Sequence, residues 1–272
     1  MTRRFTWNRI AQCVVVLLCA LSLKLYYSSA TADQLRWILA PTTAVVQVIN
    51  GVSFEFESHS GYLSSDRGFL IANSCAGVNF LITAFLMLSM RKLLVGGSKQ
   101  IAWGFLTTSA LTAYLVTVFA NAARISIALR LQGTAGEICG LNPAQLHRVE
   151  GIVVYFGFLL LLFVVSERMN PEKTSGLFRE FFFPLLVYYG TAIGIPLANG
   201  AYRKGSDFWE HSLFVLLIPL LFMIPLAAFR IYRQSRCRRS PKVPPSAGPL
   251  LACVGTTKEQ PRISRIAQMD HE

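Results

Sequence analysis

Six long apolar segments constrain the fold of this chain more than any other feature of its sequence. They cover residues 10–27, 69–90, 101–123, 148–166, 181–200 and 212–229. An α-helix needs about 20 apolar residues to cross the hydrocarbon core of a bilayer. The composition, with 53% hydrophobic and 15% charged residues, is also that of a polytopic membrane protein. We therefore predict an all-α, integral membrane helical bundle with about six transmembrane helices.

A seventh, weaker apolar segment covers residues 37–54. It is interrupted by Pro41, Gln47, Asn50 and Gly51. If this segment crossed the membrane, every later helix would reverse its direction and the basic loops would face outward. We interpret it as a surface-lying or re-entrant segment. The alternating pattern of residues 52–58 also fits a short strand.

Basic residues set the orientation, because the cytoplasmic loops of membrane proteins carry an excess of Lys and Arg. When the amino terminus is cytoplasmic and the six strong segments cross, 18 of the 26 Lys and Arg residues lie inside. The outer side then receives eight of the 14 acidic residues. Both termini are therefore predicted to be cytoplasmic. Lys24, near one end of the first segment, is expected to snorkel to the interface.

The two ends of the chain differ from its centre in composition. Residues 1–230 are predicted to form the multi-pass membrane domain. Residues 231–272 are basic and then rich in Pro and Gly, which predicts a disordered cytoplasmic tail. Ala30-Thr-Ala resembles a signal-peptidase site, which gives the first segment an alternative reading as a signal peptide. Cleavage there would leave the later topology unchanged.

The cysteines and the net charge exclude several functional classes. The six cysteines form no CxxC motif, so neither a metal site nor a cofactor is predicted. The formal net charge of +12 comes from residues that flank apolar segments, which is typical of topology signals and not of a nucleic-acid surface. Cys75 differs from the other cysteines because it lies in a cluster of small and polar residues, Asn73-Ser-Cys-Ala-Gly.

Cys75, Arg124 and His147 are predicted to meet at the outer face of the membrane. In the predicted topology Cys75 lies about two helical turns below the outer surface. Arg124 follows the outer end of segment 101–123, and His147 precedes segment 148–166 on the same side. Three separate helices thus bring a thiol, a guanidinium and an imidazole to one leaflet.

These three side chains are suited to acyl transfer. A nearby cation favours the thiolate form of Cys75, which is the nucleophilic form. His147 can donate a proton to a leaving amine, and Arg124 can stabilise a developing oxyanion. Cys75 would attack a peptide carbonyl and form a thioester, which an amine or water would resolve.

Each of the three also has a purely structural interpretation. Cys75 can be a small packing residue, Arg124 an interfacial anchor and His147 the flank of its helix. Arg130 and Arg148 compete with Arg124 for the same electrostatic role.

Three further residues are candidates for supporting roles. Asn121 belongs to the same helix end as Arg124, and Asn73 opens the cluster around the cysteine. Glu150 can orient a neighbouring catalytic side chain, although a position facing solvent is favoured.

Three short motifs resemble those of one known family. Asn73-Ser-Cys-Ala-Gly, Asn121-Ala-Ala-Arg-Ile and His147-x-x-x-Gly151 are similar, in this order, to the motifs of the exosortase/archaeosortase family, and most of all to exosortase K. The similarity spans roughly residues 60–166. Ala76 departs from the commoner Cys-Ser-Gly pattern of the family. Segment 37–54 and the two helices after residue 180 lie outside the similarity.

The resemblance implies a membrane-embedded cysteine endopeptidase and transpeptidase without a cofactor. Carried over motif by motif, Cys75 is the nucleophile, Arg124 the transition-state stabiliser and His147 the acid and base. Family substrates are secreted proteins whose C-terminal signal combines a motif such as Pro-Glu-Pro, a transmembrane helix and a basic cluster. An acceptor at the cell envelope then receives the cleaved protein. The implied location is a bacterial cytoplasmic (inner) membrane, where the protein contacts membrane lipid and its active site faces the periplasm.

Two functions of other classes stay open. Intramembrane polar residues mark transport pathways, and a segment interrupted by Gly and Pro at 189–197 suits the broken helices of a carrier. Against a carrier, the apolar segments contain no acidic residue at mid-depth and no evident repeat. A non-catalytic scaffold for envelope biogenesis is the other alternative, and it would tolerate replacement of Arg124 and His147.

Overall fold

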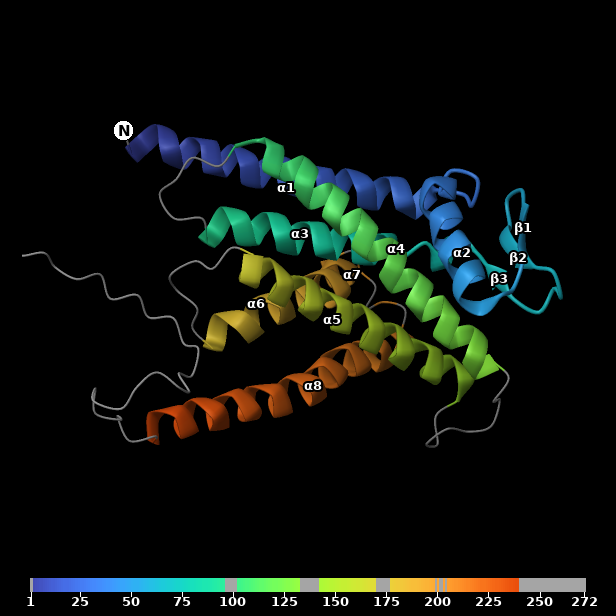
Figure 1. Cartoon of the computed structure of the whole chain (residues 1–272). Helices are drawn as coiled ribbons and strands as arrows, with labels where there is room; N and C mark the ends of the chain where they lie inside the picture. Colours follow the sequence, from blue (N-terminus) through green and yellow to red (C-terminus); the bar gives the residue numbers. More distant parts are fainter. Residues whose placement is uncertain are drawn as a thin grey trace, which may run out of the picture. The chain divides into compact units, whose positions relative to one another are not determined.

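The structure, a computed structural model, describes residues 2–95, 102–132, 142–169, 177–198, 200, 203 and 205–239. The chain divides into two compact units, Met1–Pro225 and Leu226–Glu272. It is mostly helical (Figure 1). The predicted loop residues Lys99, Glu137, Cys139 and Lys173 lie outside the described residues.

Five of the described helices are long and apolar enough to cross a membrane. They are α1 (Thr2–Ser29), α3 (Val78–Val95), α4 (Gly104–Gln132), α5 (Pro143–Met169) and α8 (Ser206–Arg239). They include most of five of the six predicted segments, which confirms the prediction of a helical membrane bundle.

The sixth predicted segment, 181–200, forms a helix broken into three pieces. These are α6 (Leu177–Tyr189), the π-helical turn η2 (Gly190–Gly194) and α7 (Ile195–Ala198). The continuous apolar part, Phe182–Leu197, is shorter than the five long helices. The number of long apolar helices in the described chain is therefore five, and the prediction of six is met only if this broken helix also crosses.

The weaker segment 37–54 begins as a short helix. α2 (Arg36–Asn50) has 15 residues, which is about 22 Å of helix and too short to span the hydrocarbon core upright. Gly51, which caps the end of the helix directly after Asn50, adopts the left-handed conformation. α2 packs along α4, where the Tyr114 hydroxyl donates to the Trp37 carbonyl at 2.9 Å and Asn50 Nδ2 donates to Ser126 Oγ at 2.7 Å. This agrees with the interpretation that the segment does not cross.

A small antiparallel sheet follows α2 in this otherwise helical fold. Its strands pair in sequence order as β1 (Phe54–Glu57), β2 (Gly61–Ser64) and β3 (Leu70–Ile71). The strand predicted as an alternative for residues 52–58 is confirmed by β1. In the turn before β3, the Ser64 hydroxyl and the Gly68 amide donate to Asp66 and hold the pKa of that carboxyl below its usual value. The turn delivers the chain to β3 and then to the cysteine.

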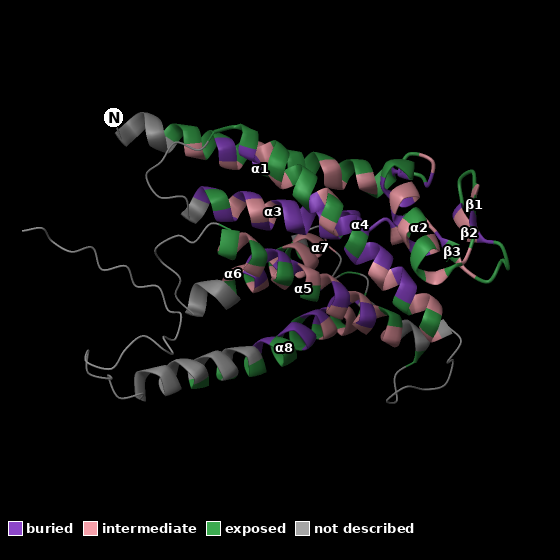
Figure 2. Cartoon of the chain, in the orientation of Figure 1, coloured by how far each residue is buried: buried purple, intermediate pink, exposed green. Residues whose placement is uncertain are grey.

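α3 is the central helix of the first unit. In the apolar span Asn73–Leu93, which includes most of α3, 56% of the most apolar stretch is buried inside the protein. The corresponding share for the span Trp7–Ser29 of α1 is 17%. Figure 2 shows this difference as a nearly continuous band of buried residues on α3. α3 contacts α1, α4, α5 and α6. The residues that begin α3 are therefore surrounded by other helices.

The carboxyl-terminal helix is longer than its apolar segment. α8 continues to Arg239, so the prediction of a disordered tail is wrong for residues 231–239. Arg and Gln are good helix formers and allow the helix to continue beyond its apolar part. Residues 240–272 of the predicted tail lie outside the described residues.

Candidate active site

Cys75 lies just before a helix and not inside one, which corrects the predicted depth of two helical turns. It ends the short 3₁₀ turn η1 (Asn73–Cys75), and α3 begins at Val78. Gly77, between the turn and the helix, has φ +70°, a left-handed conformation that favours glycine. The cluster of small residues is thus a backbone turn that presents Cys75 at the start of the central helix.

Asn121 holds the backbone of this turn. Its side chain is fully buried, and Nδ2 donates to the Cys75 carbonyl oxygen. A Cβ atom at Gly77 would lie 3.1 Å from Asn121 Cγ, which is tighter than most real Cβ contacts. The approach of α4 to the turn therefore depends on glycine at position 77. Asn121 acts on the backbone of the nucleophile and not on its thiol.

Arg124 and His147, which were predicted to lie at the same membrane face, are in direct contact. Arg124 Nη2 lies 2.6 Å from His147 Nε2. Arg124 can only donate hydrogen bonds, so Nε2 must be the acceptor and the ring proton must lie on Nδ1. Nδ1 lies 3.4 Å from Glu150 Oε2. The guanidinium and the carboxylate thus fix one tautomer of His147.

Glu150 is buried, so the favoured solvent-facing position is wrong. Only 8% of the residue is exposed, and its carboxylate contacts His147 one helical turn earlier. Oε1 of Glu150 is buried without a hydrogen-bond partner. The alternative prediction, that Glu150 orients His147, fits this geometry.

Cys75 lies within electrostatic range of Arg124, which also interacts with Tyr155 and Glu150. The thiol is half-buried, and Sγ makes no hydrogen bond to any described residue. For the predicted proton transfer the Cys75 thiol must approach Nε2 of His147, and catalytic contacts of unliganded sites often form only when substrate binds.

Tyr155 is a site residue that was not predicted. Its hydroxyl accepts from Arg124 Nη1 at 3.2 Å and donates to Asn121 Oδ1 at 2.9 Å. Its ring stacks on Phe80 of α3 with centroids 5.0 Å apart. The sequence contained a signal, because positions 147, 151 and 155 follow one another at helical spacing on one face of α5.

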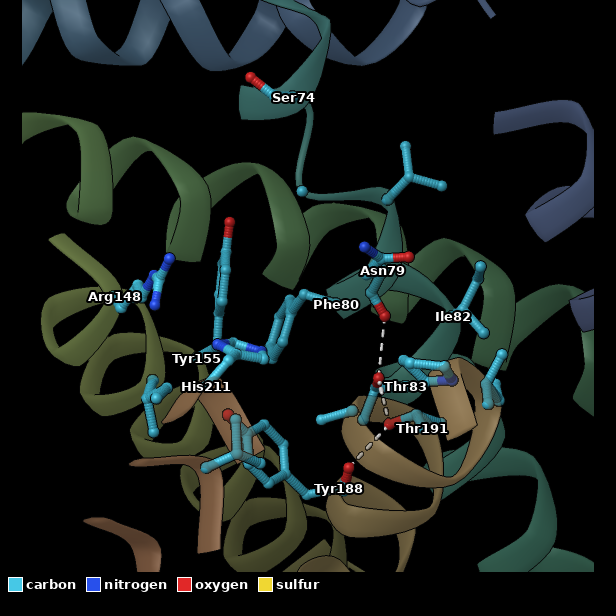
Figure 3. A pocket seen from close by; sticks show the side chains of 18 of the residues that line it. Ser74, Asn79, Phe80, Ile82, Thr83, Arg148, Tyr155, Tyr188, Thr191 and His211 are labelled. Atoms are coloured by element: carbon cyan, nitrogen blue, oxygen red, sulfur yellow. Dashed lines mark hydrogen bonds between the residues drawn. The ribbon is translucent and has the colours of Figure 1, made fainter. Parts of the chain in front are cut away.

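A cavity of about 370 Å³ opens beside these residues. Arg124, His147 and Tyr155 line it together with residues of α1, α3, η2 and α8. Figure 3 shows Tyr155 beside Phe80 on one side of the cavity and the hydrogen-bonded pair of Thr83 and Thr191 on another. The cavity is large enough for part of a peptide. Arg124 and His147 line it, whereas Cys75 does not, although Ser74 and Gly77 on either side of its turn do.

The remaining candidates are placed as follows. Arg148 lines the cavity and lies 3.8 Å from Glu210, whereas Arg130 is exposed and does not line it. Asn73 lies on the turn of Cys75, but its side chain is exposed, and its carbonyl accepts from the Tyr27 hydroxyl at 3.5 Å. Asn73 is thus not brought into the site.

Lys24, predicted to snorkel to the interface, is half-buried near the carboxyl end of α1. Its Nζ donates to Asn79 Oδ1 at 2.8 Å, and Lys24 lines the cavity. Among the described residues no group of three His, Cys, Asp or Glu side chains could hold a metal ion.

Comparisons of the chain with protein-family models, with curated proteins and with solved structures found no match.

Proposed function

We propose that this chain is a membrane-embedded cysteine endopeptidase and transpeptidase similar to the exosortase/archaeosortase family. It cleaves the C-terminal sorting signal of secreted proteins and transfers them to an acceptor at the cell envelope. One observation supports this proposal most. Cys75 is fixed through its own carbonyl by Asn121, within range of an Arg124 guanidinium that lies 2.6 Å from His147.

In the first half-reaction Cys75 is acylated. The thiol proton passes to Nε2 of His147, and Sγ attacks the carbonyl carbon of the scissile peptide. Arg124 donates hydrogen bonds to the resulting oxyanion. When the intermediate collapses, the C–N bond breaks and His147 returns the proton to the leaving amine. Glu150 stabilises the imidazolium that exists between these two proton transfers.

In the second half-reaction the thioester is resolved. An acceptor amine or water gives its proton to His147 and attacks the thioester carbon. The C–S bond breaks, and Cys75 leaves as a thiolate that recovers the proton. Arg124 again stabilises the oxyanion. The choice between transfer and hydrolysis depends on which nucleophile reaches the cavity.

The proposed orientation places this site at the outer face of a bacterial cytoplasmic membrane. The broken helix of residues 177–198 supports six crossings, because Glu210, at the start of α8, lies beside Arg148, at the start of α5. The chain therefore returns to the same level after leaving α5. With six crossings the amino terminus and the end of α8 are both cytoplasmic. The substrate helix would approach the cavity laterally from the lipid.

The test of this function is replacement of the nucleophile. The probe is a tagged secreted reporter that ends in Pro-Glu-Pro, an apolar helix and a basic cluster, co-expressed with the full chain. Cys75→Ala and Cys75→Ser should both abolish processing, while Cys13→Ser should not. Cys13 is a suitable control because it is also a half-buried free cysteine, but it lies in α1 and not in the turn that Asn121 holds. Unchanged processing in both Cys75 variants would refute the cysteine mechanism.

The cavity is also the observation that favours a small-molecule carrier as the second candidate. It lies between helices and is lined by polar groups such as Lys24, Thr83 and Thr191. A carrier would tolerate Cys75→Ala and would leave the reporter uncleaved in every variant. The same experiment therefore separates the two candidates.

A further inference from the structure

We propose that Tyr155 is a positioning residue that connects Arg124 to the backbone of Cys75. This inference rests on the proposed function, because it assigns a role in activating the same nucleophile. Its basis is a continuous chain of hydrogen bonds from α5 to α4 and then to the turn before α3. No short motif of the sequence includes Tyr155.

The direction of every hydrogen bond in this chain follows from the chemistry of its ends. The Cys75 carbonyl can only accept, so the Asn121 amide nitrogen must face it. Asn121 Oδ1 therefore faces Tyr155, whose hydroxyl must donate to it at 2.9 Å. The Tyr155 oxygen is then left to accept from Arg124 Nη1 at 3.2 Å. All donors point from Arg124 towards Cys75.

A series of hydrogen bonds that all point in one direction is cooperative, because each donor polarises the next. Arg124 carries a permanent charge at its beginning, so the polarisation reaches the peptide group that bears the nucleophile. The same contacts limit the orientation of the guanidinium. One nitrogen is held by Tyr155 and the other by His147, which leaves the remaining Nη hydrogens for a substrate oxygen.

The surroundings of Tyr155 fix its hydroxyl in place. Its ring stacks on Phe80. Asn121, which accepts the hydrogen bond from its hydroxyl, is fully buried. Loss of the hydroxyl would leave a buried amide oxygen and a guanidinium N–H without their partner. Phenylalanine retains the ring and its stacking, so Tyr155→Phe removes only the connection.

The experiment measures the reactivity of Cys75 without any substrate. The rate of alkylation by iodoacetamide is measured on the full chain in detergent, at pH 7 and at pH 10, with labelled Cys75 quantified by mass spectrometry. In Tyr155→Phe the rate at pH 7 should fall about 10-fold, because a cation that favours the reactive thiolate is no longer held in place. At pH 10 the thiol ionises without help, so the two rates should converge. A purely structural role would change both rates alike.

Two controls make the result specific. Tyr189→Phe removes a hydroxyl that donates to the Leu216 carbonyl at 2.7 Å, away from the site, and should leave both rates unchanged. In an Arg124→Ala background, Tyr155→Phe should have no further effect, because the two residues act through each other. Equal rates in wild type and Tyr155→Phe at pH 7, or full additivity with Arg124→Ala, would overturn the inference.

Alkylation needs no substrate, so it separates this inference from the proposed function. If Cys75→Ala leaves reporter processing intact, the proposed function fails regardless of the alkylation rates. If Cys75→Ala abolishes processing and Tyr155→Phe changes neither the alkylation nor the processing rate, only the role of Tyr155 fails.

Discussion

Arg124 connects three parts of the site. It holds His147 with one terminal nitrogen and Tyr155 with the other, and it interacts electrostatically with Cys75. A planar guanidinium can make these contacts at once, whereas an ammonium is a point charge. The geometry of the site therefore needs arginine and not simply a positive charge.

Replacing Arg124 by lysine should separate the charge from the geometry. Arg124→Lys keeps the cation but cannot reach both Tyr155 and His147, so reporter processing should fall about 10²–10³-fold, as when an oxyanion donor is lost. Arg130→Lys is the matched control, because Arg130 is exposed and outside the cavity. Processing by Arg124→Lys at the wild-type rate would show that charge alone is sufficient.

Gly151 makes room for the same arginine. A Cβ atom at this position would lie 3.4 Å from Arg124 Nε, an ordinary contact, whereas a longer side chain would enter the space of the guanidinium. Gly151→Ala should therefore retain processing and raise the free energy of unfolding by about 0.5–1 kcal/mol, since glycine weakens a helix interior. Gly151→Leu should lose processing. Thermal unfolding and reporter cleavage measure the two effects, and a fully active leucine variant would contradict this account.

At the scale of elements, the start of α3 determines where the nucleophile lies. The turn η1 and the left-handed Gly77 place Cys75 outside the helix, and α4 approaches through Asn121. A β-sheet delivers the chain to this turn on one side, and the most buried helix begins on the other. Backbone contacts thereby hold Cys75 in the turn between Ser74 and Gly77, and these two residues line the cavity.

Substitution of Gly77 should damage both stability and function. Gly77→Ala puts a side chain in a left-handed conformation and against Asn121, so the free energy of unfolding should fall by about 1–3 kcal/mol. Processing should fall as well, because Asn121 must move away from the Cys75 carbonyl. Gly51→Ala is the control. Gly51 has φ +69°, but a Cβ atom added there would meet no other atom within 4 Å, so this variant should lose stability and keep processing.

The sequence predicted the elements of this site better than their junctions. Charge and hydropathy identified the long helices and brought Arg124 beside His147, because helix ends follow from the length of apolar segments. The depth of Cys75 was wrong, since segment 69–90 reads as one helix although its first residues form a strand and a turn. Tyr155 and the burial of Glu150 depend on which face of α5 meets α4, and a single apolar sequence does not reveal that packing.

At the scale of the whole molecule, the topology decides whether the site faces substrate. The first unit contains long helices that are apolar on most of their surface, and α1 exposes many large apolar side chains. These surfaces are suited to lipid. If the broken helix 177–198 crosses the membrane, α8 begins at the outer face, and if it does not cross, α8 begins at the cytoplasmic face.

Accessibility of single cysteines should show six crossings. In a background in which all six native cysteines are replaced by alanine, Ser58→Cys and Arg203→Cys should react with a membrane-impermeant maleimide on intact spheroplasts. Lys92→Cys, exposed near the end of α3, should react only after the membrane is permeabilised. If Arg203→Cys behaved like Lys92→Cys, residues 177–198 would not cross and the proposed orientation of α8 would be wrong.

The central claim is that Cys75 carries the substrate as a thioester, and mass spectrometry of the acid-quenched chain tests it most directly. After co-expression with the reporter, the peptide that contains Cys75 should carry the cleaved reporter, and hydroxylamine should release it. The adduct should be absent in Cys75→Ala. A reporter that is cleaved while Cys75 never carries an adduct, and that is cleaved equally by Cys75→Ala, would contradict the account.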